Sequence, residues 1–222
     1  MPFLKSTVGR KMLMAITGLM MLLFVVIHVI GNSTIYFGWL NAYAEHLHAL
    51  PPLVWVFRLF MLTMFSLHLV FGIQLALENR AAKPDAYALK KSLRASFASK
   101  NMIWTGLIIA AFLVYHLLHF TAQVTNPAIS SGNNLDSLGR PDVFKMVVLS
   151  FRNIFISSLY VGAMVALAFH LIHGMQSFFQ TLGLNNDSTF PVIVRGGTLA
   201  AVIISLGYIA IPLLIFTGTV KG

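Results

Sequence analysis

Long apolar runs dominate this chain, and short polar stretches separate them. Five runs approach or exceed the roughly 20 residues that a helix needs to cross a bilayer: Met12–Phe37, Pro52–Leu77, Met102–Val124, Ile154–Leu182 and Pro191–Thr217. An amphipathic segment beginning at Asp142 leads into the fourth run. The pattern predicts an all-α fold, an integral membrane bundle of five transmembrane helices that forms a single domain over residues 1–222.

Charged residues are few and lie mainly at the ends of the apolar runs. They make up 9% of the chain against 58% hydrophobic residues, whereas about a quarter of a soluble domain is charged. The net charge of +9 therefore indicates membrane orientation, and we expect membrane lipids and no nucleic acid as partners.

Lysine and arginine favour the cytoplasmic side of a membrane. Their positions predict a cytoplasmic N-terminus and an external C-terminus. The inner set is Lys5, Arg10, Lys11, Arg80, Lys83, Lys90, Lys91, Arg94, Lys100 and Arg195, and the outer set is Arg58, Arg140, Lys145, Arg152 and Lys221.

The chain contains no cysteine, so it has no thiolate for an iron–sulfur cluster or for covalent haem attachment. It also has no glycine-rich dinucleotide fingerprint after a strand. Any flavin or cluster must therefore belong to other subunits. The first apolar run is too long for the core of a signal peptide, so we expect no cleaved leader.

Four histidines lie inside four different apolar runs: His28, His68, His116 and His170. An ionisable ring inside a bilayer is costly and is usually functional. Imidazole is also a common axial ligand of haem iron in helix bundles. The four rings predict two haem b groups, each with two histidine ligands; the alternative is that they are buried hydrogen-bonding partners.

The depths of these histidines arrange them in two level pairs. At a helical rise of roughly 1.5 Å per residue, His28 lies about 24 Å and His116 about 22 Å from the cytoplasmic face. His68 and His170 lie about 14 Å and 15 Å from that face. We therefore predict an outer pair, His28 with His116, and an inner pair, His68 with His170.

Two of these runs carry a second histidine three residues further on, His119 and His173. Depth favours His170 over His173, at roughly 10 Å, but it does not separate His116 from His119. The spare rings could contact haem propionates or quinone, or could simply pack. Glycines also follow three of the predicted ligands, where they could admit a porphyrin or serve helix packing: Gly31, Gly72 and Gly174.

Motifs around these histidines occur in a fixed order along the chain. They are Gly9-Arg10-Lys11 with Met14-Ala15-Ile16-Thr17-Gly18, His28-Val29-Ile30-Gly31-Asn32, His68-Leu69-Val70-Phe71-Gly72, Tyr115-His116-Leu117-Leu118, and His170-Leu171-Ile172-His173-Gly174 followed by Ser177 and Gln180-Thr181-Leu182-Gly183. From about Gly9 to Gly183, the chain resembles the cytochrome b membrane subunit of succinate dehydrogenase and quinol:fumarate reductase, in its five-helix, single-chain, dihaem form.

The resemblance implies a membrane anchor and electron-transfer subunit in a bacterial cytoplasmic (inner) membrane. It favours His116 over His119 and His170 over His173, and it implies the same two pairs as the depths do. Its partners would be a flavoprotein subunit and a cytoplasmic iron–sulfur subunit. Its substrate would be a membrane quinone, with menaquinone expected, bound on this subunit near the outer haem. Some dihaem fumarate reductases carry a glutamate two residues before the fourth-helix ligand, where this chain has Ala168.

A quinone site also needs a titratable group near the outer haem. Glu45, His46 and His48 follow the first run at the right depth, in what we expect to be an outer loop, and Arg58 begins the second run. The alternatives are a solvated loop and an interfacial arginine anchor. A basic stretch on the inner side also has two interpretations: Arg80, Lys83, Lys90, Lys91 and Arg94. Membrane orientation alone explains it, and docking of the iron–sulfur subunit is an added hypothesis.

Two rival functions remain open. A cytochrome b anchor of a hydrogenase or formate dehydrogenase would need the same buried histidines but different partner subunits. A non-redox transporter or structural anchor would use the histidines for protons or for packing; transporters often show repeated halves with broken helices, and this sequence has no such repeat.

Overall fold

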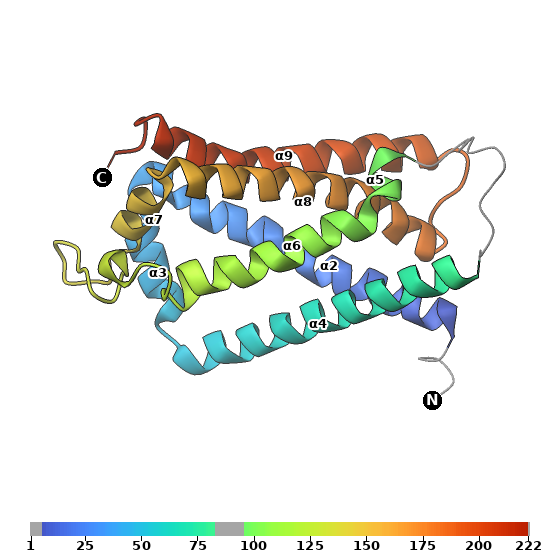
Figure 1. Cartoon of the computed structure of the whole chain (residues 1–222), viewed down its shortest axis with the longest axis horizontal. Coiled ribbons are helices and arrows are strands. Elements are labelled where there is room, and N and C mark those ends of the chain that lie inside the picture. Colours follow the sequence, from blue (N-terminus) through green and yellow to red (C-terminus); the bar gives the residue numbers. More distant parts are fainter. Residues whose placement is uncertain (1–5, 83–95, 222) are drawn as a thin grey trace.

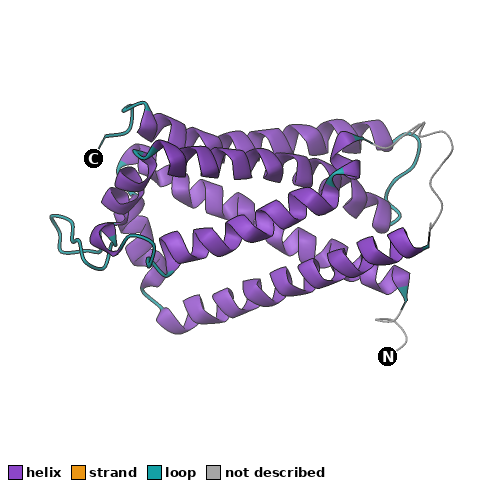
Figure 2. Cartoon of the chain, viewed as in Figure 1, coloured by secondary structure: helices purple, strands orange, loops and turns teal. Residues whose placement is uncertain are grey.

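The computed structural model describes residues 6–82 and 96–221, which fold into a bundle of five long helices (Figure 1). Each is long and apolar enough to cross a membrane. Within the described residues only helices, loops and one isolated bridge occur, and no strand forms (Figure 2). This confirms the predicted all-α class with five spans. The long helices are α2 Thr7–Asn32, α4 Pro51–Ala81, α6 Met102–His116, α8 Ile154–Thr181 and α9 Phe190–Phe216.

Two of the long helices continue past their last α-helical residue as another type of helix. The first continues as a 3-10 helix, η1 (Ser33–Phe37), and α6 continues as a π-helical turn, η2 (Leu117–Thr121). The predicted spans therefore hold to within a few residues, except that α2 begins five residues before Met12. Asn153 caps α8 by accepting hydrogen bonds from the backbone amides of Phe155 and Ile156, so the fourth span begins where the sequence predicted.

Four short helices complete the described chain: α3 Leu40–His48, α5 Phe97–Lys100, η3 Pro127–Ile129 and α7 Val143–Phe151. Helix α7 is the predicted amphipathic lead-in, with Asp142 as its N-cap. The segment expected as an outer loop between the first two spans instead contains α3. Its buried Leu40 and half-buried Tyr43 pack against the apolar cluster that α7, α8 and α9 form, and tertiary packing of this kind stabilises a helix too short to be stable alone.

The long helices alternate in direction, which gives the bundle two distinct ends (Figure 1). The α5 end holds the start of α2, the end of α4 and the connection between α8 and α9. The α7 end holds α3, α7 and the end of α9. The described members of the predicted inner basic set belong to the α5 end: Arg10, Lys11, Arg80, Lys100 and Arg195. The other five lie outside the described residues: Lys5, Lys83, Lys90, Lys91 and Arg94.

Helix α2 is central to the bundle because it contacts α4, α8 and α9. Its neighbour α9 is fixed to it where the Tyr208 hydroxyl donates a 2.7 Å hydrogen bond to the Val25 carbonyl. At the α5 end, Arg10 forms a bidentate ion pair with Glu78 of α4, and the Nη2 to Oε2 distance is 2.9 Å. These contacts hold α2 against α9 and against α4.

Candidate functional site

The four histidines in the long helices lie side by side in two pairs. His28 of α2 faces His116 of α6, with ring centroids 6.0 Å apart and ring planes at 90°. His68 of α4 faces His170 of α8, with centroids 6.3 Å apart and planes at 61°. The structure thus brings together the same partners that the depth estimate matched.

The geometry of each pair fits one metal ion held between two rings. An imidazole nitrogen binds a metal ion at about 2.0 Å, so two rings on opposite sides of one ion have centroids roughly 6 Å apart. Among the residues that the structure describes, no group of three or more His, Cys, Asp or Glu side chains could hold a bare metal ion. Haem iron needs only two protein ligands, because the porphyrin supplies the others. The donor set therefore fits haem better than a free ion.

Two threonines orient the rings of the pair nearer the α5 end. Thr17 Oγ1 lies 3.2 Å from His68 Nδ1, and Thr105 Oγ1 lies 3.3 Å from His170 Nδ1. Each threonine hydroxyl donates to a carbonyl in the preceding turn of its own helix. The hydroxyl oxygen is then free to accept a hydrogen bond from the histidine Nδ1–H. This arrangement leaves Nε2 of each ring unprotonated, which is the state a metal ligand requires.

Each of these threonines is followed by a glycine that lies against the same ring. A Cβ on Gly18 would come 3.1 Å from His68 Cε1, and a Cβ on Gly106 would come 3.3 Å from His170 Cε1. The Thr-Gly dipeptides of α2 and α6 therefore contact the rings of His68 and His170 in the same way. One residue holds the ring by a hydrogen bond, and the next leaves room for the ring.

The two pairs lie at two levels of the bundle. We call His68 with His170, which lie nearer the α5 end, the lower pair, and His28 with His116 the upper pair. In α2, Thr17 beside the lower pair stands eleven positions before His28 of the upper pair. In α6, Thr105 likewise stands eleven positions before His116. At the rise of an α-helix this spacing is about 16 Å. The pairs therefore differ in depth by roughly half of a hydrocarbon core about 30 Å thick.

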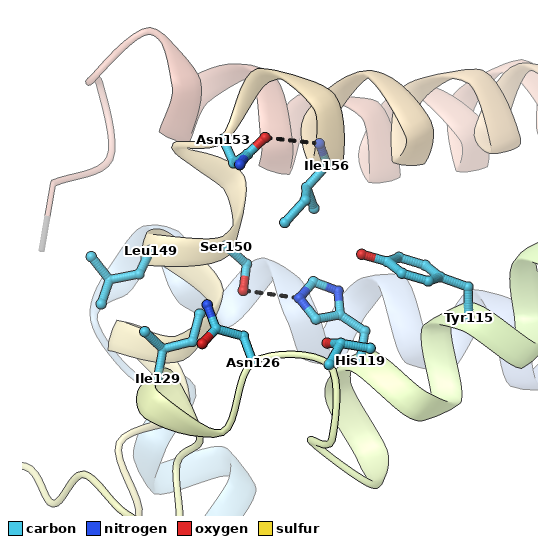
Figure 3. Close-up of a pocket in the computed structure, with 9 residues that line it drawn as sticks. Tyr115, His119, Asn126, Ile129, Leu149, Ser150, Asn153 and Ile156 are labelled. Carbon is cyan, nitrogen blue, oxygen red and sulfur yellow. Dashed lines mark hydrogen bonds between the residues drawn. The ribbon is translucent and has the colours of Figure 1, made fainter.

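The upper pair connects to a buried polar chain. The Tyr160 hydroxyl lies 3.4 Å from His116 Nδ1 and 2.9 Å from His119 Nδ1. His119 Nε2 lies 3.1 Å from Ser150 Oγ, which itself donates to the Met146 carbonyl at 2.8 Å (Figure 3). One consistent set of donors satisfies the chain: His116 Nδ1–H donates to Tyr160, Tyr160 O–H donates to His119, and His119 Nε2–H donates to Ser150.

The hydrogen-bonded chain through Tyr160 gives different surroundings to His116, the last residue of α6, and to His119 in η2. His116 faces His28, whereas His119 is 5% exposed and lies between Tyr160 and Ser150. The π-helical turn that begins at Leu117 contains His119, and such turns are frequent at functional sites. Because Tyr160 occupies His116 Nδ1, the Nε2 of that ring is left for a ligand bond.

Comparison with known proteins now identifies the kind of chain. The sequence model of one family, described as the succinate dehydrogenase/fumarate reductase transmembrane subunit, matches residues 76–205. The chain belongs to this family. The match covers more than half of the sequence, including His116, His119 and His170, while His28 and His68 precede it. No curated protein and no solved structure matches the chain.

As a succinate dehydrogenase/fumarate reductase transmembrane subunit, the chain is a multi-pass membrane protein that assembles with catalytic partner subunits. This membership agrees with the resemblance drawn from the histidine motifs. The dihaem type of the subunit stays a prediction.

The residues predicted for quinone lie at the α7 end, where Glu45, His46 and His48 are exposed and Arg58 is partly buried. Glu45 is 3.6 Å from Arg140, His46 Nδ1 contacts the Ala42 carbonyl, and His48 Nε2 lies 3.5 Å from Arg58, whose guanidinium also covers the Trp55 ring. Helix α3 and the start of α4 thus hold these side chains on the surface. A quinone role for them stays a prediction.

Five residues beside the histidines have no role assigned from the sequence, although Thr17 and Gly18 stand in one of the quoted motifs. They are Thr17, Gly18, Thr105, Gly106 and Tyr160. The repeated Thr-Gly dipeptide, placed eleven residues before a predicted ligand in both α2 and α6, is the signal that could have found four of them. Of the glycines we did consider, Gly31 packs against Tyr43, which supports the packing alternative there.

Proposed function

We propose that this chain carries two b-type haems and exchanges electrons between a membrane quinone and the catalytic subunits of a succinate dehydrogenase or fumarate reductase. The observation that supports it most directly is the pairing of four membrane-embedded histidines at centroid distances of 6.0 and 6.3 Å. Family membership supplies the reaction, because the complex interconverts succinate and fumarate.

His28 and His116 are the proposed ligands of one haem, and His68 and His170 those of the other. When bound, each haem supplies reversible one-electron transfer, because two histidine ligands leave the iron no open position for oxygen chemistry. Thr17, Thr105 and Tyr160 accept the Nδ1–H of their histidines and so fix the ring that each presents. Such outer partners also make a ligand more basic.

We propose that the α5 end faces the cytoplasm, since the sequence places ten lysines and arginines on the predicted inner side of the spans and five on the outer side. The iron–sulfur subunit would dock there, with the flavoprotein subunit beyond it. The described basic residues at this end are Arg10, Lys11, Arg80, Lys100 and Arg195, of which Arg10 is paired with Glu78. The C-terminus would then lie outside a bacterial cytoplasmic membrane, and the quinone would react near the α7 end.

The pairing can be tested by removing one histidine at a time from the full complex. Redox titration and electron paramagnetic resonance of the low-spin haem signals would show which haem each variant loses. We expect His28→Ala and His116→Ala to lose one and the same signal, and His68→Ala and His170→Ala to lose the other. His119→Ala, the matched control three residues from a ligand, should retain both signals. Variants of one pair that lose different signals would overturn the assignment.

A further inference from the structure

A small, partly open cavity lined by polar and apolar atoms lies beside His119 at the α7 end, where η2 approaches the junction of α7 and α8 (Figure 3). Its volume is about 190 Å³. The polar side chains around it include those of Tyr115, His119, Ser150 and Asn153, and apolar atoms come from Leu149 and Ile156. This is the mixture of apolar walls and a few placed polar groups that is typical of a small-molecule site.

A second cavity runs between α6 and α8 at the depth of the membrane. It has a volume of about 570 Å³ and is lined mainly by apolar side chains: Ile108, Ala111, Phe112, Tyr115, Ser158, Leu159, Gly162 and Ala163. Ile108 and Leu159 are 51% and 47% exposed, so this groove is open on the side that faces lipid. Its volume and apolar lining suit an apolar chain that enters from the bilayer.

Tyr115 lines both the polar cavity and the apolar groove, so the two adjoin at this residue. The ring of Tyr115 also packs beside His119, with centroids 5.3 Å apart. A ligand that fills both spaces needs a compact polar ring at one end and a long apolar tail at the other. A prenylated quinone has this shape and polarity.

We propose that the cavity beside His119 binds the ring of a prenylated quinone and that the groove between α6 and α8 holds its tail. The proposal deepens the proposed function and depends on it. Neither cavity is lined by Glu45, His46, His48 or Arg58, so it places the quinone away from the residues that the sequence suggested.

The polar chain gives the ring in this cavity a route to the upper histidine pair. Tyr160 bonds both His119 and His116, so the cavity is two hydrogen bonds from a proposed haem ligand. A quinone carbonyl oxygen beside Ser150 would accept the Nε2–H of His119, while Ser150 keeps its bond to the Met146 carbonyl. His119 is then the group that donates a hydrogen bond to the ring and exchanges a proton with it.

The electrons and protons that a quinone needs at this site can be accounted for by the reaction of the complex and by water. A quinone becomes a quinol by taking up two electrons and two protons. The electrons come from succinate through the catalytic subunits, and the protons come from water at the α7 end, where Thr125 and Asn126 of the cavity wall are exposed. In the direction of fumarate reduction the same electrons and protons leave the quinol.

Equilibrium binding of tritium-labelled menaquinone-4 and of tailless menadione to the purified complex tests the site. His119→Ala removes the hydrogen-bond donor at the ring and should weaken binding of both probes by about tenfold. Gly162→Leu fills the groove without a clash at Cβ, since nothing lies within 4 Å of that position. It should weaken menaquinone-4 and leave menadione unchanged. Gly196→Leu is the matched control, because Gly196 is also an exposed helical glycine with no atom within 4 Å.

Haem content, measured in every variant, distinguishes a failure of the proposed function from a failure of the proposed quinone site. A wild-type complex that lacks haem or binds no menaquinone-4 contradicts the proposed function itself. A complex with two haems that binds menaquinone-4 equally well in the wild type, His119→Ala and Gly162→Leu overturns the site and leaves the function standing. Loss of binding in Arg58→Ala, with His119→Ala unaffected, would move the quinone to the surface of α3 and α4.

Discussion

Loss of the hydroxyl of Thr105 should affect His170 more than loss of the hydroxyl of Thr17 affects His68. His68 Nδ1 has a second acceptor, the Met14 carbonyl at 3.2 Å, in addition to Thr17. Within the described residues, Thr105 is the hydrogen-bond partner found for His170 Nδ1. Thr105→Val therefore leaves a buried N–H without an acceptor, whereas Thr17→Val leaves His68 with the carbonyl.

The size of the two effects follows from this difference. An unsatisfied buried donor costs about 1–3 kcal/mol, while the loss of one of two shared hydrogen bonds costs about 0.5–1 kcal/mol. We expect Thr105→Val to weaken haem retention roughly 10- to 100-fold and Thr17→Val by only a few fold. Because the hydrogen bond makes the ligand more basic and favours oxidised iron, its loss in Thr105→Val should raise the midpoint potential of the lower haem by about 20–60 mV.

Redox titration of the haem absorbance in the purified complex, together with haem loss to a competing haem-binding protein, measures both effects. Thr105→Ser is the control, since it keeps a hydroxyl at the same backbone position and should behave as the wild type. Equal shifts in Thr17→Val and Thr105→Val, or a lower potential in Thr105→Val, would refute the reasoning that Nδ1–H of His170 depends on Thr105.

Two further predictions follow from single contacts. Gly106→Ala places a Cβ 3.3 Å from the His170 ring, so the ring must shift by a few tenths of an ångström. We expect the electron paramagnetic resonance signal of the lower haem to change and that of the upper haem to stay the same. An unchanged signal from both haems would show that the contact is relaxed elsewhere. The hydrogen bonds from Arg140 lower the pKa of Asp136 from 3.8 to about 2. A carboxyl whose pKa is lowered on folding stabilises the fold above its unfolded pKa, and this stabilisation is lost as the pH falls through its folded pKa. The protection of backbone amides in residues 122–142 against hydrogen exchange, taken relative to an unfolded peptide at the same pH, should therefore fall between about pH 4 and pH 2, and Asp136→Asn should lose this pH dependence.

Much of the bundle could be predicted because its strongest signal is length in apolar residues. A membrane helix needs about 20 such residues whatever its partners are, and helix rise converts sequence position into depth. Depth alone matches His28 with His116, and the structure places their rings 6.0 Å apart. Depth fixes partners because helices in a bundle run nearly parallel.

Contacts between side chains of different helices could not be predicted in the same way. Sequence depth did not separate His116 from His119, because three residues change the height by less than one turn. The choice depends on rotation about the helix axis, and Tyr160 of α8 decides the position of His119 by bonding it. Helix α3 was missed for a related reason, since its stability comes from Leu40 and Tyr43 packing on distant elements.

The number of haem b groups per polypeptide tests the central claim most directly. Pyridine haemochrome absorbance of the purified complex, divided by the molar amount of this subunit from amino-acid analysis, gives that number without any assumption about direction of turnover or quinone species. The account predicts two haems per chain, both low-spin with two histidine ligands. A value of zero in protein produced with an adequate supply of haem would contradict the account, and a value of one would show that one of the two histidine pairs serves packing alone.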